Sequence, residues 1–436
     1  MTRTLLLLLS TAAFVAATAR AEAREPDQLT RSFLVGKKPH AGDAPQLLGK
    51  SPIVVNGGHS GLAGIDSVVN FTGQYTYPGF DWQGNPQSVW PWAMVGRSPR
   101  TNATTVIGAP IIPVSIDMRN ADGTPRYVNG QRLYMDATKY VWPVIDSPIF
   151  RPIKWATSLI PTQYLDALFR AQFWNGAGDG DFDRGDRISE AWHTWLLPAP
   201  RTPRVMQLAA GTYQFALNDD GTCCAFVLVD ANYFGNALFP ATTDDTTTPI
   251  GAAEHAHEMT TKDISTFLFP NTFLYEGDPS SCCIVGYHSF DMEPDAQGNF
   301  TKFYVMDFAS WVTPGLFGDS FSDITAMSHE LAEIFNDPFV SFDGVHNQTQ
   351  WWSMDWGICQ DNLEVGDVIE GLPTGVSYPV TIDGFTYHPQ NEALLQWFAG
   401  EKPSRAWHGA YSFPDTTVLT APAPSLPLNC GAGPIN

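Results

Sequence analysis

The stretch Asp323-Ile-Thr-Ala-Met-Ser-His329-Glu330-Leu-Ala-Glu333-Ile-Phe-Asn-Asp337-Pro338 decides which fold this chain can have. Its apolar residues recur at steps of three and four, at Ile324, Met327, Leu331 and Ile334. This spacing predicts a capped helix with one face on a core and its polar residues on the other side. His329 and Glu333 are four residues apart, so they stack one turn above the other and can reach one ion. The sequence therefore predicts a metal-site helix.

The spacing matches the His-Glu-x-x-His pattern with one ligand changed. In metalloproteases of that type two His bind zinc and the Glu is the general base. Here Glu330 has the position of the base, and Glu333 replaces the second His. The match to a zinc motif favours zinc, but a carboxylate in that place shifts selectivity toward harder ions, so calcium and manganese are alternatives. The competing interpretation is an ordinary amphipathic surface helix with exposed acids.

The segment Cys359-Gln-Asp-Asn-Leu-Glu364-Val-Gly-Asp367 supplies the missing ligand. We expect the third oxygen to come from Glu364 or Asp367, as in sites whose last ligand follows the helix. Asp337, at the end of the predicted helix, could orient a ligand or cap the loop.

The run from Ser328 to Asp367 combines Ser-His-Glu-x-x-Glu, Asn-Asp-Pro, a Trp-rich loop and Glu-x-x-Asp near a Cys, and Gly286-Tyr-His288-Ser precedes it. This pattern resembles the phosphate-induced, EXORDIUM-like family of secreted proteins and zincin-like metallopeptidases, over roughly residues 255 to 370. The resemblance implies an α+β fold: a zincin-like domain with a mixed sheet and a metal-site helix, and His288 as a further site residue. Two departures are Asn336, where the pattern has Thr, and Cys359, which precedes Glu364 where the family's Cys follows the Asp.

Residues 1–21 have the features of a secretory signal peptide. Arg3 precedes a Leu-rich run that ends at the small-x-small sequence Ala19-Arg-Ala21. We therefore expect a secreted protein, extracellular or periplasmic. No later segment approaches the ~20 apolar residues of a membrane span. The net charge of −21 argues against nucleic acid as a partner.

The 436 residues exceed what one hydrophobic core usually fills, and the 44% hydrophobic content excludes a disordered chain. We divide the chain into an extended or propeptide-like arm at 22–50, a β-rich N-terminal region at 51–200, a metallopeptidase-like domain at 201–400 and a Pro-rich tail at 401–436. Residue patterns predict strands at 105–117, 223–229 and 303–306, a turn at 121–124 and a helix at 164–174.

Six cysteines in an exported chain predict three disulfides. Cys223-Cys224 and Cys282-Cys283 are adjacent pairs, and closing a ring within such a pair strains the peptide between the two residues. We therefore expect bonds between the two pairs, or from them to Cys359 and Cys430. Zinc binding by these thiolates is disfavoured, because the usual two-residue spacing is missing.

Two further groups of residues suggest ion binding. Asp179, Asp181, Asp183 and Glu190 have the ligand spacing of an EF-hand loop, although Arg184 occupies the position that requires Gly. The alternative for this segment is an exposed acidic turn. His255 and His257 alternate as two ligands on a strand would, but a surface loop is favoured for them, and His193 is expected to be a packed core residue.

Clustered tryptophans could stack on sugar rings or wall a peptide cleft, and core packing is the alternative; they are Trp90, Trp92, Trp351, Trp352 and Trp356. The leading functional hypothesis is a secreted metal-dependent hydrolase, above all a peptidase, with Glu330 handling the proton. A second is a non-catalytic, metal-stabilised protein that binds carbohydrate or cell wall. A third, a glycosidase with two of these carboxylates, depends on their separation. The substrate or partner would be a peptide or a cell-wall polymer, and the sequence carries no indication of oligomeric state.

Overall fold

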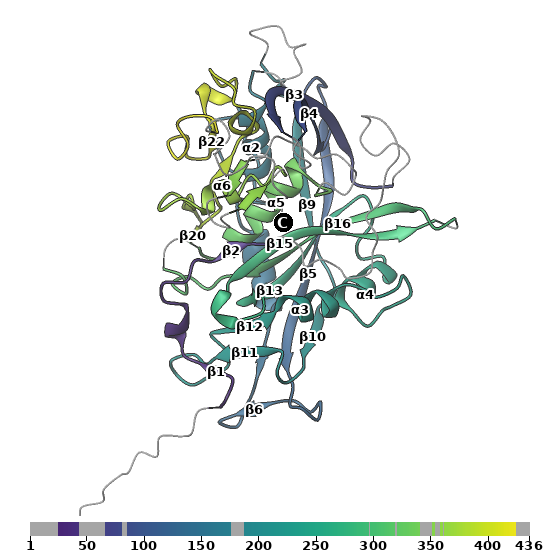
Figure 1. Cartoon of the computed structure of the whole chain (residues 1–436), viewed down its shortest axis with the longest axis vertical. Coiled ribbons are helices and arrows are strands. Elements are labelled where there is room, and N and C mark those ends of the chain that lie inside the picture. The colour runs from purple at the N-terminus through teal and green to yellow at the C-terminus, as the bar shows by residue number, and fades with distance from the viewer. Residues whose placement is uncertain are drawn as a thin grey trace, which may run out of the picture.

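The computed structural model describes residues 25–42, 66–80, 85–175, 187–295, 297–318, 321–340, 351–353, 358–360 and 362–423. Strands outnumber helices, and both are mixed along the chain (Figure 1). The predicted α+β class is therefore confirmed at this level. The predicted signal peptide lies outside the described residues. Among the described residues, no helix is long and apolar enough to cross a membrane.

A curled, mixed sheet forms the centre of the molecule. Its main path is β1-β11-β12-β14-β15-β16-β13-β5-β10, and β2, β8 and β9 pair with strands of that path. The strands are β1 (Gln28–Leu29), β2 (His40–Ala41), β5 (Thr104–Met118), β8 (Tyr134–Met135), β9 (His193–Pro200), β10 (Arg204–Leu208), β11 (Tyr213–Ala216), β12 (Phe226–Asp230), β13 (Ile264–Pro270), β14 (Thr272–Tyr275), β15 (Ile284–Pro294) and β16 (Phe300–Trp311). The strand predictions near 105–117, 223–229 and 303–306 correspond to β5, β12 and β16.

The long strand β5 connects the two halves of the sheet. It is rich in Val and Ile, which favour extended backbone, and every residue from Ala109 to its end at Met118 is buried. It pairs in parallel with β9 along its first half, with β13 at its middle and with β10 along its second half. The predicted turn follows it, closed by Asp122, whose carboxylate accepts hydrogen bonds from Thr124. The predicted regions 51–200 and 201–400 thus contribute to one sheet.

Small two-stranded sheets and short helices surround this centre. The sheets are β3 (Asn70–Phe80) with β4 (Pro86–Val95), β6 (Tyr127–Val128) with β7 (Gln131–Arg132), β17 (Trp351–Ser353) with β18 (Ile358–Gln360), β19 (Val380–Ile382) with β20 (Phe385–Tyr387), and β21 (Glu392–Ala393) with β22 (Ser412–Phe413). The α-helices are α1 (Val141–Ile145), α2 (Tyr164–Gln172), α3 (Ala231–Leu238), α4 (Pro249–His255), α5 (Thr325–Asn336), α6 (Asp367–Glu370) and α7 (Leu395–Phe398). Four 3-10 helices are η1 (Arg31–Leu34), η2 (Thr138–Tyr140), η3 (Pro279–Ser281) and η4 (Trp407–Gly409). The predicted helix at 164–174 is α2.

Helix α5 lies in the interior, and every one of its residues is buried. It packs on β15 and β16 and also contacts α2, β2 and β4 (Figure 1). Phe335 meets Phe169 of α2 with ring centroids 5.0 Å apart. A helix surrounded by protein on all sides is unlike the predicted one with a single apolar face. The alternative of an exposed amphipathic helix is therefore wrong, because the rest of the chain covers the polar side as well.

The described part of the N-terminal arm is bound into the sheet. In residues 25–42, β1 pairs in parallel with β11, and β2 pairs in parallel with β15. Arg126 also binds the arm, through ion pairs with Asp27 and Glu25. This arrangement brings β2 next to the strand that carries His288.

The described cysteines are all in disulfides, as predicted, but the predicted pairing of the two adjacent pairs is wrong. Cys223 bonds to Cys224, and Cys282 bonds to Cys283. The peptide bond within each pair is cis, so the two Cα atoms are only 3.0 Å apart and the sulfurs meet directly. Cys359 is disulfide-bonded too, and no described cysteine is free. Cys430 lies outside the described residues.

Candidate metal centre

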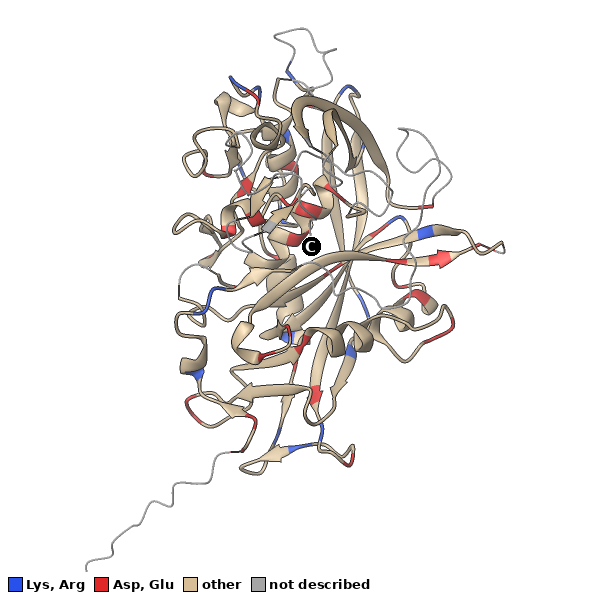
Figure 2. Cartoon of the chain, viewed as in Figure 1, with Lys and Arg blue, Asp and Glu red and all other residues tan. Residues whose placement is uncertain are grey.

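Acidic residues gather where α5, β15 and α6 meet, in the upper half of the molecule (Figures 1 and 2). Five carboxylates and two imidazoles contribute: Glu330, Glu333, Glu364, Asp367, Glu370, His288 and His329. None of the seven side chains is more than 8% exposed. We call this set the acidic cluster.

His329 forms one half of the acidic cluster. Its Nε2 lies 3.0 Å from Oε1 of Glu333 and 3.5 Å from Oδ1 of Asp367. Its Nδ1 lies 3.1 Å from Oε1 of Glu370. His329, Asp367 and Glu370 offer donor atoms close enough together to hold one metal ion.

Neighbouring groups fix the carboxylates of this half. Gln360 donates from Nε2 to Asp367 Oδ2 over 3.0 Å, and the Ala41 backbone N–H, in β2, lies 3.1 Å from both oxygens of Glu370. The Gly366 N–H donates to Glu333 Oε1 over 3.1 Å. Hydrogen bonds of this kind orient metal ligands. The N-terminal arm thus helps to build the site.

His288 forms the other half. From the middle of β15 its Nδ1 lies 3.3 Å from Oε2 of Glu333 and 3.5 Å from Oε2 of Glu330. Its Nε2 lies 4.0 Å from Oε2 of Glu364. His288, Glu330 and Glu333 also meet the spacing for a metal ion. Glu333 therefore faces both imidazoles, one with each oxygen.

Several donor atoms of the cluster have no hydrogen-bond partner among the described residues. They are both ring nitrogens of His329, Nε2 of His288 and both carboxylate oxygens of Glu330. These atoms do make the ion-pair contacts given above, which bring opposite charges together. The contacts do not, however, have the geometry of hydrogen bonds. Buried polar atoms are nearly always hydrogen-bonded, so a set of exceptions at one place needs a cause. Coordination of a cation would satisfy carboxylate oxygens and one nitrogen of an imidazole ring, because an imidazole binds a given ion through a single nitrogen.

Two glycines make room for the cluster. A Cβ atom at Gly366 would overlap the His329 ring, and one at Gly286 would lie 2.5 Å from Oε1 of Glu330. Neither glycine has a positive φ. Their lack of a side chain is therefore needed for space, which lets an imidazole and a carboxylate lie directly against backbone.

Burial and mutual charge shift the pKa values of the cluster. Burial raises the pKa of Glu330 to about 7, although His288 and His329 oppose the shift. Burial would also raise the pKa of Glu333, but the two imidazoles lower it below its usual value. Burial alone would lower the pKa of His329, and the carboxylates of Glu333 and Glu370 raise it instead. The same opposition, with Glu364 as the main carboxylate, raises the pKa of His288. Without an ion the two imidazoles therefore act as the cluster's counter-cations.

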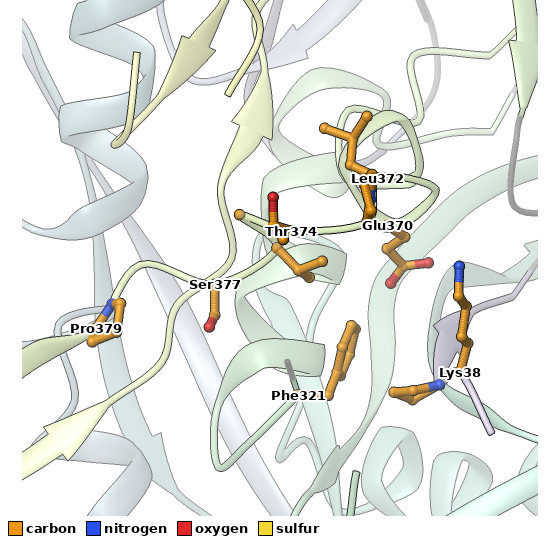
Figure 3. Close-up of a pocket in the computed structure, with 11 residues that line it drawn as sticks. Lys38, Phe321, Glu370, Leu372, Thr374, Ser377 and Pro379 are labelled. Carbon is orange, nitrogen blue, oxygen red and sulfur yellow. The ribbon is translucent and has the colours of Figure 1, made fainter. Parts of the chain in front are cut away.

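A cavity of about 450 Å³ opens beside the His329 half (Figure 3). Glu370 lines it together with Lys38 of the arm and the ring of Phe321. The rest of its wall is formed mainly by the segment 372–379 that follows α6. Figure 3 shows the Glu370 carboxylate and Lys38 on one side of this space. The cavity therefore ends at one ligand of the cluster, whose side chain is only 1% exposed.

The structure brings most of the predicted site residues together. His329, Glu333 and Asp367 are in contact, Glu364 lies beside His288, and Glu330 is directed at His288. Asp337 is buried at the end of α5 and belongs to neither metal-binding group. Sequence reasoning missed Glu370. Its spacing of three from Asp367, which places both on one face of α6, is the signal that could have found it.

Among the described residues of the other predicted ion sites, none belongs to either metal-binding group. Asp179, Asp181 and Asp183 lie outside the described residues, and Glu190 pairs with Arg170 over 3.2 Å. His255 and His257 are exposed at the end of α4, as the loop alternative predicted.

His193 is packed, as predicted, with Nδ1 2.8 Å from Oδ2 of Asp166. Three of the tryptophans, Trp90, Trp92 and Trp351, are buried core residues, Trp352 is half-buried, and Trp356 lies outside the described residues. No protein-family model, curated protein or solved structure matches this chain.

Proposed function

We propose that this protein is a metal-dependent hydrolase, above all a peptidase, whose ion is held by His329, Asp367 and Glu370. The observation that carries the proposal is the environment of the His329 ring. It is fully buried, three carboxylates surround it, and neither ring nitrogen has a hydrogen-bond partner among the described residues. A divalent cation bound through one of the two ring nitrogens and through carboxylate oxygens fits this set of donors.

One imidazole and several carboxylates suit zinc, and also manganese or calcium, which prefer oxygen ligands. A bound ion of this kind would supply Lewis acidity and lower the pKa of a coordinated water. The chain's own residues would hold and orient it. Glu333, fixed by the Gly366 N–H, sets the His329 ring, and the hydrogen bonds to Asp367 and Glu370 set the other ligands.

Glu330 is the remaining acid of α5, and we propose that turnover requires it. Burial raises its pKa to about 7, so its carboxyl can change protonation state near neutral pH. Its Oε2 lies 3.5 Å from Nδ1 of His288. Substrate would approach through the cavity lined by Glu370, Phe321 and Lys38, whose size fits a short peptide segment.

The zincin-like identity, the likeness to the EXORDIUM-like family and export of the protein are parts of the same proposal. A helix with His-Glu-x-x-Glu packed against a mixed sheet supports the first two. The basic, apolar and small-residue regions of 1–21 support export.

A non-catalytic protein stabilised by the same ion is the second candidate. The burial of all seven side chains in the acidic cluster favours it, because a structural ion needs no access for substrate. Its predicted sugar-binding surface has less support, since Trp90, Trp92 and Trp351 are in the core. The presence or absence of turnover separates the two candidates.

Elemental analysis of the full chain tests the proposal, in parallel with the variants His329→Ala and His257→Ala. We expect bound zinc, manganese or calcium in the wild type, lost in His329→Ala and kept in His257→Ala, whose histidine is exposed. Hydrolysis of a mixed peptide library, sensitive to chelator and absent in Glu330→Gln, would establish the peptidase. Metal content that is unaffected by His329→Ala would refute the site, and bound metal without turnover of any substrate would favour the structural ion.

A further inference from the structure

We infer that the acidic cluster is a two-metal centre: His288, Glu330 and Glu333 hold a second divalent cation, and Glu333 bridges it to the ion at His329. The inference rests on the proposed metal-dependent function and deepens it. It gives Glu330 the role of a ligand, in place of the general base that the sequence pattern predicts.

The separations of the donor atoms fit two ions. Donors bound at about 2.1 Å around one ion lie roughly 3.0 to 3.4 Å apart in octahedral or tetrahedral geometry. His288 Nδ1 lies 3.3 Å from Glu333 Oε2 and 3.5 Å from Glu330 Oε2. His329 Nε2 lies 3.0 Å from the other oxygen of Glu333. Each imidazole thus has its own oxygen of the same carboxylate, which is the arrangement of a bridging ligand.

The unpartnered atoms point to a ligand in the second half independently of these distances. Both oxygens of Glu330 lack a hydrogen-bond partner among the described residues, and the side chain is fully buried. His288, whose Nδ1 faces this carboxylate, is only 5% exposed. Gly286 has no side chain, which leaves space for the Glu330 carboxylate to lie against β15. The position of this carboxylate therefore depends on the glycine.

The charge of the cluster also favours two ions. Five ionised carboxylates with both imidazoles protonated leave a formal charge of −3 in the interior. The ion pairs found for Glu330, Glu333 and Asp367 in the described part of the chain are all with the two histidines. One divalent ion bound to neutral imidazoles leaves −3 as well, whereas two leave −1. Buried charge is costly unless it is compensated, so the second ion stabilises the cluster more than protons do.

In two-metal hydrolases the ions lie about 3.5 to 4 Å apart and act together on one substrate group. The shared carboxylate sets that spacing here. The cavity beside Glu370 reaches the His329 ion first. The His288 ion lies deeper, against β15, where Glu330 would hold it.

The test is the stoichiometry of metal binding to the chelator-treated full chain. Mn²⁺ and Zn²⁺ are titrated separately by calorimetry, the bound metal is counted after gel filtration, and the Mn²⁺ form is examined by electron paramagnetic resonance. We expect two equivalents in the wild type, with the spectrum of two coupled Mn²⁺ ions. His288→Asn and Glu330→Gln should each bind one equivalent with the spectrum of an isolated ion, and His257→Ala should bind two.

Each result that differs from this expectation contradicts either the second metal site or the proposed function. If the wild type binds one equivalent of metal and His329→Ala binds none, the second site is refuted and the proposed function stands. An unchanged metal count in Glu330→Gln, with loss of turnover, also removes the second site and returns Glu330 to the role of base. No bound metal in the wild type refutes the proposed function itself. Because Gln matches Glu in size, Glu330→Gln and the wild-type spectrum decide the question even if His288→Asn does not fold.

Discussion

Replacing Gly366 with alanine tests whether the backbone before α6 is shaped around the His329 ring. The φ of Gly366 is −79°, which alanine adopts without strain. On backbone grounds alone the variant would be more stable by about 0.4–1 kcal/mol, because alanine restricts the unfolded chain. The new Cβ atom would however lie 2.7 Å from Cγ of His329 and closer still to two other ring atoms. No pair of real atoms tolerates that overlap, so the ring or the backbone must move.

The expected cost follows from the packing of the ring. His329 is fully buried, with carboxylates at both ring nitrogens, so it has no free space to turn into. Overpacking a site of this kind costs about 1–3 kcal/mol, which exceeds the gain from the backbone. Displacing a ligand by a few tenths of an ångström should also weaken metal binding by about 10–100-fold, as changes behind the ligands do.

Urea denaturation in the presence of chelator measures the first effect, and competition with a fluorescent chelator measures the second. Gly286→Ala is the matched comparison, since its Cβ would meet the Glu330 carboxylate and not His329. We expect it to lose the second ion and keep the first. A Gly366→Ala protein with wild-type stability and wild-type metal affinity would refute the description of this site.

Three further predictions concern protons, the core and the arm. The surrounding carboxylates raise the pKa values of His288 and His329, so these rings carry protons until the pH exceeds the raised values. A metal ion must displace those protons, and its affinity should therefore rise with pH. Calorimetry in buffers of different ionisation enthalpy should show the release of protons. Asp166→Ala should destabilise the fold by on the order of 3 kcal/mol in urea, because it leaves three buried partners without their acceptor at a cost of about 1–3 kcal/mol each, while metal content stays unchanged. Arg126→Gln should speed tryptic cleavage within residues 25–42, since it removes the ion pairs that hold the arm, and cleavage at the wild-type rate would show that strand pairing alone secures it.

Local patterns predicted the elements of this fold well. The period of three and four along α5 and the β-branched run of β5 depend on neighbours in sequence, and both elements appear where they were expected. The burial of α5 on every side was not predictable in the same way. It results from packing by β4 and α2, which are distant in sequence, and the helix itself shows only one apolar stripe.

The site was predictable only where its residues are close in sequence. His329 and Glu333 share a helix, so their spacing predicts that they meet. Glu370 depends on β2, whose Ala41 N–H orients it from more than 300 residues away in the chain. The disulfide pairing was predicted wrongly because a ring within an adjacent pair was expected to strain the peptide, whereas the peptide bond in each pair is cis and the ring closes.

The enclosure of α5 would also determine how long an ion bound in the acidic cluster stays there. With every residue of the helix covered, an ion in the His288 half can leave only when the packing around α5 opens. Opening of a core element is a rare event whose free energy approaches that of global unfolding. The rate at which that ion is released should therefore be limited by the rate of local unfolding. Its exchange with labelled metal in solution should be far slower than the exchange of the ion beside the cavity. Two chemically similar ions in one cluster would then differ in residence time because of the fold around them.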